Sequence, residues 1–156
     1  MTGREFRVKG MYFEDLQVGD SIASPGRTIT ETDLVNFCGL SGDFNELHSN
    51  EEYASTTAFG KRIAHGILGL SVASGLASRL GFLEGTAEAF MGLEWRFKHP
   101  IYAGDTVHLR ADVVNKREIP RLHGGLIYLD VELMNQRDEI VQEGQWTLLL
   151  KGRPAA

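Results

Sequence analysis

The chain has 156 residues, of which 42% are hydrophobic and 24% are charged, and its formal net charge is -5. This composition predicts one globular domain over residues 1–156. The acidic balance, with scattered lysines and arginines, argues against a nucleic-acid partner, because phosphate contacts need a basic surface. A single cysteine, Cys38, excludes an internal disulfide and a cysteine-pair metal site. The first ten residues are polar, unlike a signal peptide, so we expect a cytoplasmic protein without a membrane partner.

The first third of the chain predicts short elements. A brief strand is expected at residues 21–23, and a helix should begin at Thr30, where Thr30 and Asp33 have the spacing of a capping box. This helix should end at Ser41 and Gly42. Residues 43–49 are polar and predict a connector.

A second short helix should follow the connector. Asn50 is suited to cap a helix over residues 51–59, and Gly60 is suited to end it. The long apolar segment of residues 64–80 comes next and predicts a central helix. Its apolar residues surround the helical wheel, so we expect it to be buried on all sides.

The second half changes to an alternating pattern, in which every second residue is apolar. This pattern predicts four strands, at residues 89–99, 106–116, 125–135 and 140–151, with a longer loop over residues 118–125. Helices followed by such strands predict an α+β fold with an antiparallel sheet that curls around the central helix. Because one sheet shields only part of that helix, we expect a homodimer.

Three polar residues on the connector are candidates for chemistry. Asp43, Asn45 and His48 lie within six residues, so a carboxylate and an imidazole could converge on one water molecule as a general acid/base pair. The alternative is that Asp43 and Asn45 form a turn and His48 is a surface residue.

The start of the central helix adds a second candidate feature. The Gly66 N–H would lack an intrahelical acceptor there, and it could stabilise a carbonyl oxygen that gains negative charge. Ser74 lies two turns further on and could orient Asp43 or Asn45. For His65 we expect a capping role or a core hydrogen bond. A metal site of Asp43, His48 and His65 lacks a recognisable ligand spacing, so we expect no metal.

These residues lie in a stretch that closely resembles the MaoC-like hydratase/dehydratase family, the (R)-specific enoyl-CoA hydratases, whose fold is the hotdog. The core of the resemblance is SGDFNELHSNEEYASTTAFGKRIAHGILGLSVASGL. The opening YFEDLQVGD and the later segment HPIYAGDTVHLRADVV extend it over most of the chain. The resemblance implies an antiparallel sheet wrapped around a long central helix.

The resemblance also implies the site and the reaction. Asp43 and His48 match the catalytic pair, which activates water for syn addition to C3 of a trans-2-enoyl thioester, giving a (3R)-3-hydroxyacyl thioester. Gly66 matches the N–H that binds the thioester oxygen, Asn45 and Ser74 match supporting positions, and no cofactor is implied. The chain departs from the family at two positions, where it has Glu46 in place of the usual Pro and Asn50 in place of the usual Asp.

Several alternatives stay open. The acyl group could be branched or dicarboxylic, as in mesaconyl-CoA-type hydratases, and the chain length, the direction and the choice of CoA or acyl carrier protein are not set. A hotdog thioesterase is one alternative, but such enzymes typically use a carboxylate on the central helix, and residues 66–78 contain none. A non-catalytic acyl-CoA-binding protein would need no Asp/His pair. Candidate residues for binding the CoA phosphates are Lys61, Arg62, Arg96 and Lys98, although exposed basic residues on a strand are often only solvated.

Overall fold

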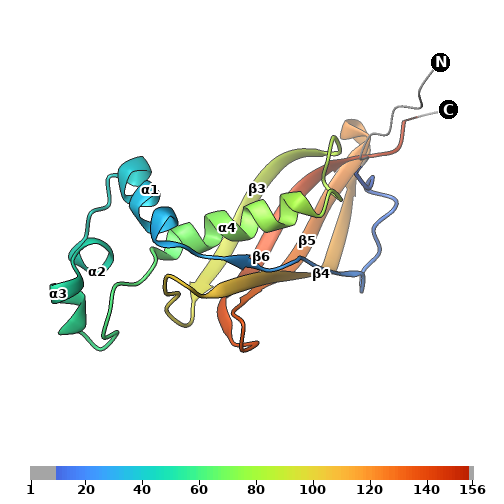
Figure 1. Cartoon of the computed structure of the whole chain (residues 1–156). Coiled ribbons are helices and arrows are strands. Elements are labelled where there is room, and N and C mark those ends of the chain that lie inside the picture. The colour runs from blue at the N-terminus through green and yellow to red at the C-terminus, as the bar shows by residue number, and fades with distance from the viewer. Residues whose placement is uncertain (1–9, 155–156) are drawn as a thin grey trace, which may run out of the picture.

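The computed structural model describes residues 10–154, so most of the polar amino-terminal segment lies outside the described residues. One curved antiparallel sheet dominates the structure (Figure 1). Its strand order is β1-β4-β5-β6-β3, and a short strand, β2, also pairs with β4. The strands are β1 (Ser21–Ala23), β2 (Arg27–Thr28), β3 (Ala87–Phe97), β4 (Thr106–Ile119), β5 (Gly124–Met134) and β6 (Ile140–Lys151).

The central helix, α4 (Gly66–Arg79), runs across one face of this sheet, as Figure 1 shows. One face of α4 carries the buried residues Leu68, Gly69, Val72, Ala73, Leu76 and Ala77. All of them except Gly69 join the inward-facing residues of β4, β5 and β6 in one hydrophobic core. The predicted arrangement of a sheet around a central helix is therefore confirmed.

The prediction that α4 is buried on all sides is wrong for a single chain. Ile67 is 54% exposed, and Ser71, Ser74 and Gly75 are also exposed along the same helix. The reason is geometric, because a sheet on one side can cover only one face of a helix.

The first helix, α1 (Glu31–Ser41), begins as predicted. Thr30 is its N-cap, and Thr30 and Asp33 exchange the two hydrogen bonds of a capping box, while Gly42 ends the helix in a left-handed conformation. Burial alone would raise the pKa of Asp33. The hydrogen bonds from Thr30 and the Arg27 guanidinium outweigh burial and hold that pKa below its ordinary value of 3.8.

Two helical boundaries differ from the prediction. Part of the expected connector forms a short helix, α2 (Glu46–Ser49), because the Asn45 side chain accepts a hydrogen bond from the Leu47 N–H and caps it. The next helix, α3 (Glu51–Ser55), ends earlier than expected. The hydroxyls of Thr56 and Thr57 donate to carbonyls of this helix and compete with its continuation.

The predicted strands are all present, with small shifts. β3 lies two residues earlier than predicted because the Lys98 and His99 N–H groups both turn to the Val141 carbonyl. β4 is longer than predicted, and a single turn at Pro120–Leu122 replaces most of the expected loop.

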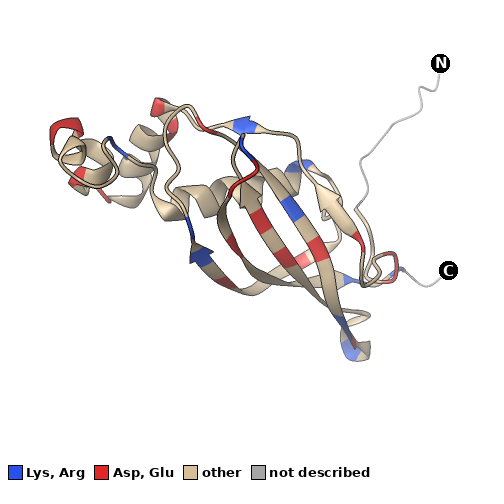
Figure 2. Cartoon of the chain, turned by 90° about the horizontal axis from the view of Figure 1, so that it is seen from below, with Lys and Arg blue, Asp and Glu red and all other residues tan. Residues whose placement is uncertain are grey.

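The helices α1, α2 and α3 gather at the amino-terminal end of α4, far from the two described ends of the chain (Figure 1). Lys and Arg are interspersed with Asp and Glu over the face in Figure 2, without a basic stripe. Among the described residues, no helix has both the length and the apolar character that a membrane span requires.

Candidate active site

The fold brings Asp43, His48 and His65 together. Asp43 follows α1, His48 lies on α2, and His65 directly precedes α4. One side-chain atom of each residue, a ring nitrogen or a carboxylate oxygen, lies within 4.8 Å of the others. One water molecule can bridge a carboxylate and an imidazole at such a separation. The predicted convergence of Asp43 and His48 is therefore present in the structure.

His48 is held in a defined orientation by the chain between α3 and α4. Its Nδ1 lies 2.7 Å from the carbonyl oxygen of Ile63. A carbonyl can only accept, so Nδ1 carries the proton and donates it. In the neutral ring this leaves Nε2 as an acceptor, which is the form that a general base requires.

His65 contacts both members of the pair. Its ring stacks on the His48 ring, with centroids 3.7 Å apart and an interplanar angle of 26°. Its Nε2–H donates to the backbone carbonyl of Asp43 at 2.9 Å. The expected core hydrogen bond is thus present, whereas the expected side-chain cap of α4 is not. His65 is 3% exposed, and its Nδ1 has no hydrogen-bond partner among the described residues.

Asp43 and Asn45 organise the loop between α1 and α2. The Asp43 carboxylate accepts a hydrogen bond from the Asn45 N–H at 3.1 Å, and Asn45 in turn caps α2. Asp43 is exposed, so its carboxylate is open to water and substrate. Asn45 therefore supports the site by fixing the loop and the helix that carry Asp43 and His48.

The two positions that depart from the family pattern contact one another. The Glu46 carboxylate accepts a hydrogen bond from the Asn50 side-chain amide at 2.8 Å. This contact is exposed and occupies one Glu46 oxygen, at an i, i+4 spacing.

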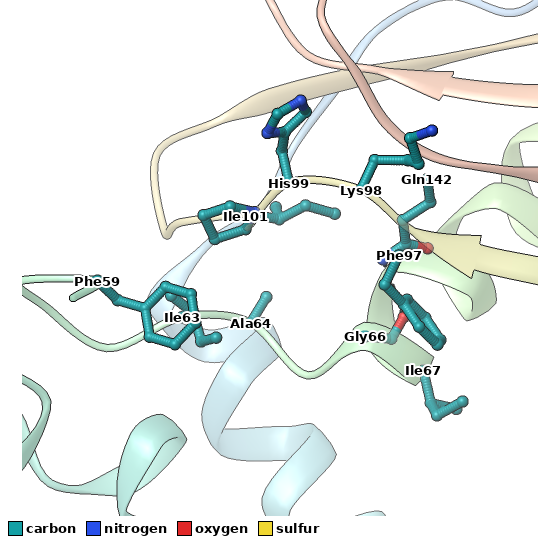
Figure 3. Close-up of a pocket in the computed structure, with 11 residues that line it drawn as sticks. Phe59, Ile63, Ala64, Gly66, Ile67, Phe97, Lys98, His99, Ile101 and Gln142 are labelled. Atoms are coloured by element: carbon teal, nitrogen blue, oxygen red, sulfur yellow. Dashed lines mark hydrogen bonds between the residues drawn. The ribbon is translucent and has the colours of Figure 1, made fainter. Parts of the chain in front are cut away.

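Gly66 is the first residue of α4, and its N–H belongs to the first turn, which lacks intrahelical acceptors. It lines a pocket of about 490 Å³ at the amino-terminal end of the helix (Figure 3). The Phe97 ring lies so close that a Cβ at Gly66 would be 2.7 Å from it. The pocket is lined by Phe59, Ile63, Ala64, Gly66, Ile67, Phe97, Lys98, His99, Pro100, Ile101 and Gln142.

Ser74 does not join the site within one chain. Its hydroxyl donates to the Ser71 carbonyl at 2.8 Å, and the side chain lies on the exposed face of α4. The expected hydrogen bond from Ser74 to Asp43 or Asn45 is therefore absent from the described contacts.

The four basic candidates lie in different surroundings. Lys98 lines the pocket and also pairs with Glu143 at 3.1 Å. Lys61 lies over the Tyr102 ring, 4.6 Å from its centroid. Arg96 lines a groove of the sheet together with Glu94, Asp130, Glu132 and Glu143, away from the pocket.

Arg62 is held by two carboxylates. It contacts Glu31 at 2.6 Å and Glu51 at 2.7 Å. These hydrogen bonds raise the pKa of the guanidinium above its ordinary value. An arginine bound in this way tethers α1 to α3, which leaves Lys98 as the basic candidate that lines the pocket.

The distances among Asp43, His48 and His65 would accept a metal ion, but the ring geometry does not favour one. A metal needs the lone pairs of both imidazoles about 2.0–2.1 Å from one point. Two stacked rings instead aim their in-plane lone pairs along nearly parallel planes. The arrangement is better suited to holding a water molecule.

Comparison with known proteins agrees with this geometry. Residues 15–132 match the family model described as MaoC like domain. The chain belongs to the MaoC-like family. The match covers the loop with Asp43 and His48, α4, and the strands β1 to β4 with most of β5.

The relatives of this MaoC-like chain include enzymes. It is 45% identical over 97 residues to an (R)-specific enoyl-CoA hydratase from Rhodospirillum rubrum, covering 62% of this chain and 65% of that one. It is 42% identical over 100 residues to Protein MaoC from Klebsiella aerogenes, covering 64% of this chain and 29% of that one. The chain thus spans less than two thirds of the length of either relative.

Solved structures show the same fold. A protein titled monoamine oxidase regulatory protein from Archaeoglobus fulgidus has a TM-score of 0.87 and 36% identity, covering 94% of this chain and 97% of that one. A Mycobacterium tuberculosis protein described as a double hotdog fold has a TM-score of 0.84 at 23% identity, covering 97% of this chain and 47% of that one. The predicted hotdog fold is confirmed.

Two features of this MaoC-like site were not foreseen from the sequence. The Ile63 carbonyl that orients His48 is a backbone atom, and no residue type signals it. Gln142 lines the pocket and is 2% exposed. The sequence offers a signal for Gln142, because it is a polar residue in the same alternating row as Trp146, Leu148 and Leu150.

Proposed function

We propose that this chain adds water to C3 of a trans-2-enoyl-CoA to give a (3R)-3-hydroxyacyl-CoA, or catalyses the reverse dehydration. The observation that carries the proposal is the pairing of an exposed Asp43 carboxylate with a His48 ring whose Nδ1–H is already committed to Ile63. The name of the Rhodospirillum rubrum relative supports the substrate class.

In the proposed reaction, one member of the pair takes a proton from the bound water as its oxygen attacks C3. The π electrons move toward C2 and the thioester oxygen, which gains negative charge. Gly66 N–H, at the positive end of the α4 dipole, stabilises that oxygen. The acid form of the pair then delivers a proton to C2 on the same face, so water is added without any change in redox state.

The protonated state of His48 is also accommodated. If Nε2 accepts the proton, Nδ1–H keeps its hydrogen bond to the Ile63 carbonyl, so the ring need not turn during the reaction. His65 keeps the ring in place by stacking and holds the Asp43 backbone. A fixed ring lowers the cost of reaching the reactive geometry.

The pocket in Figure 3 suits the CoA arm. It contains Gly66, where the thioester oxygen would bind, but neither Asp43 nor His48, which would lie beside C2 and C3. The sulfur and its pantetheine arm therefore extend into this pocket, while the acyl chain extends from the pair. Lys98 lines the same pocket, and we propose that it contacts a phosphate of CoA.

We also propose a homodimer. β3 is an edge strand, and it exposes Phe90, Met91, Leu93 and Phe97, while α4 exposes Ile67. An exposed apolar edge strand favours pairing with another chain. A second copy would cover these residues together with the exposed face of α4, on which Ser74 lies.

The test of the function follows the loss of enoyl-thioester absorbance when the purified protein meets crotonyl-CoA, with thiol release measured in parallel. The proposal predicts absorbance loss without free CoA, and chiral analysis should give the (3R) product. Release of CoA would instead indicate a thioesterase. Inactivity on crotonyl-CoA, on a longer enoyl-CoA and on a branched or dicarboxylic enoyl-CoA would refute the hydratase.

A further inference from the structure

We propose that Gln142 is a positioning residue for the thioester-binding turn at Gly66, an inference that rests on the proposed function. Gln142 lies on β6 opposite Phe97 of β3, with its side chain in the core. Within the inward-facing row that includes Trp146, Leu148 and Leu150, it is a buried polar residue. A buried amide is costly unless both of its ends are hydrogen-bonded.

Both ends of the Gln142 amide are hydrogen-bonded, in a way that fixes its orientation. The Trp95 Nε1–H donates to Oε1 at 2.9 Å, and Nε2–H donates to the Gly66 carbonyl at 3.0 Å. An indole nitrogen can only donate and a carbonyl can only accept, so a flipped amide would lose both bonds. The amide therefore links the sheet to the first residue of α4.

The link matters because glycine restricts its own backbone less than other residues do. Gly66 is the first residue of the helix, where helices fray, and it has no side chain to pack. Gln142 holds its carbonyl, and the Phe97 ring packs against its Cα, as Figure 3 shows. With both contacts in place, the backbone of Gly66 at the pocket wall keeps one conformation, and its N–H therefore keeps one direction.

The close approach of α4 to the Gln142 amide depends on a glycine in the helix, Gly69. A Cβ at Gly69 would lie 2.2 Å from Gln142 Nε2. Glycine at this position lets the amide reach past the helix surface to Gly66. The space at Gly69 thus allows the Gln142 amide to reach the Gly66 carbonyl. This contact points to a role for Gln142 in the geometry of the first turn of α4.

The experiment compares Gln142→Met and Gln142→Glu with Gln145→Met. Gln145 lies on the same strand, but it is exposed and bonds Asp130, so it controls for changes in β6. Glutamate is nearly isosteric with Gln142 and can still accept from Trp95. A buried glutamic acid can donate its O–H to Gly66 while it is neutral and loses that donor when it ionises, so this variant is assayed from neutral to alkaline pH. The glutamate variant keeps the test valid if the methionine variant folds poorly.

Two readouts separate positioning from folding. The first is kcat and KM for crotonyl-CoA. The second is the red shift of 4-(dimethylamino)cinnamoyl-CoA on binding, which reports polarisation of the thioester carbonyl. Gln142→Met, and Gln142→Glu at alkaline pH, should lose roughly tenfold or more in kcat with KM within about threefold, and most of the red shift, because a misdirected donor acts mainly on the transition state. Gln145→Met should match the wild type.

The outcomes distinguish the two proposals. If the wild type hydrates crotonyl-CoA and shifts the absorbance of the probe, and both Gln142 variants do the same, the proposed role of Gln142 is overturned. The proposed function then stands. A wild-type protein that neither hydrates enoyl-CoA nor shifts the probe would overturn both. Loss of kcat and of the red shift in folded variants would support positioning.

Discussion

The substitution Gly69→Ala should destabilise the protein, although alanine is the better helix former. Gly69 lies inside α4, where alanine would by itself gain about 0.8–1 kcal/mol. The added Cβ, however, would lie 2.2 Å from Gln142 Nε2 and 2.8 Å from its Cδ and Oε1. The amide must then move by roughly 1 Å in a close-packed core.

The cost follows from that displacement. Overpacking a core typically costs about 1–3 kcal/mol. Moving the amide also breaks its bonds to Gly66 and Trp95, for about 1 kcal/mol or more. After subtracting the gain in helix propensity, we expect a net loss of about 2 kcal/mol, which lowers Tm by about 4–8 °C in a chain of this size.

The matched control is Gly39→Ala on α1. A Cβ at Gly39 would meet nothing within 4 Å, so this variant should gain about 0.5–1 kcal/mol. Thermal and urea unfolding should be followed at one protein concentration, because a dimer makes Tm concentration-dependent. A Gly69→Ala variant as stable as the wild type, beside a stabilised Gly39→Ala, would refute the packing of Gln142 against α4.

Three further outcomes are expected. His65→Phe keeps the stacked ring but loses the N–H that holds the Asp43 carbonyl. We expect kcat/KM to fall roughly tenfold to a hundredfold, and the free energy of unfolding to change by less than about 1 kcal/mol. Unchanged kcat/KM would show that the hydrogen bond is dispensable. Asp33→Ala should cost about 1 kcal/mol in urea unfolding at pH 7. Because the folded pKa of Asp33 lies below 3.8, this contribution is present above that pH and is lost as pH falls through the folded pKa, so a difference from wild type that grows in acid would contradict the assignment. Lys98→Met should raise KM for crotonyl-CoA several-fold at low salt with little change in kcat. The control, Arg96→Met, should leave KM and kcat unchanged. Equal effects of these two substitutions would argue against Lys98 as a CoA contact.

Most of the fold could be predicted because it depends on local sequence patterns. Alternating apolar residues identify the four long strands, and the apolar run at residues 64–80 identifies α4. The Thr30 and Asp33 capping box marks the start of α1. The end of α3 was predicted wrongly because of local competitors, the hydroxyls of Thr56 and Thr57. The burial of α4 was overestimated because the sheet covers only one of its faces.

The sequence predicted which residues form the candidate site. It did not predict the contacts that hold them in place. The spacing of Asp43 and His48, and the family resemblance, brought out the pair. The sequence could not indicate that Ile63 offers its carbonyl to His48, or that His65 donates to the Asp43 carbonyl, because backbone acceptors carry no residue signature. The role of Gln142 likewise depends on the register of β6 against β3, which is a tertiary property.

If Asp43 and His48 act together on one water molecule, the loss of either residue should disable both. The measurement is kcat/KM for crotonyl-CoA in Asp43→Asn, His48→Asn and the double variant. Each single variant, shown to be folded, should lose at least about a hundredfold, the usual scale for a general acid/base group. The double variant should lose little more than either single one, because the two residues form one unit. A folded single variant that keeps kcat/KM within about tenfold of the wild type would show that the replaced residue is not a general acid or base of the reaction.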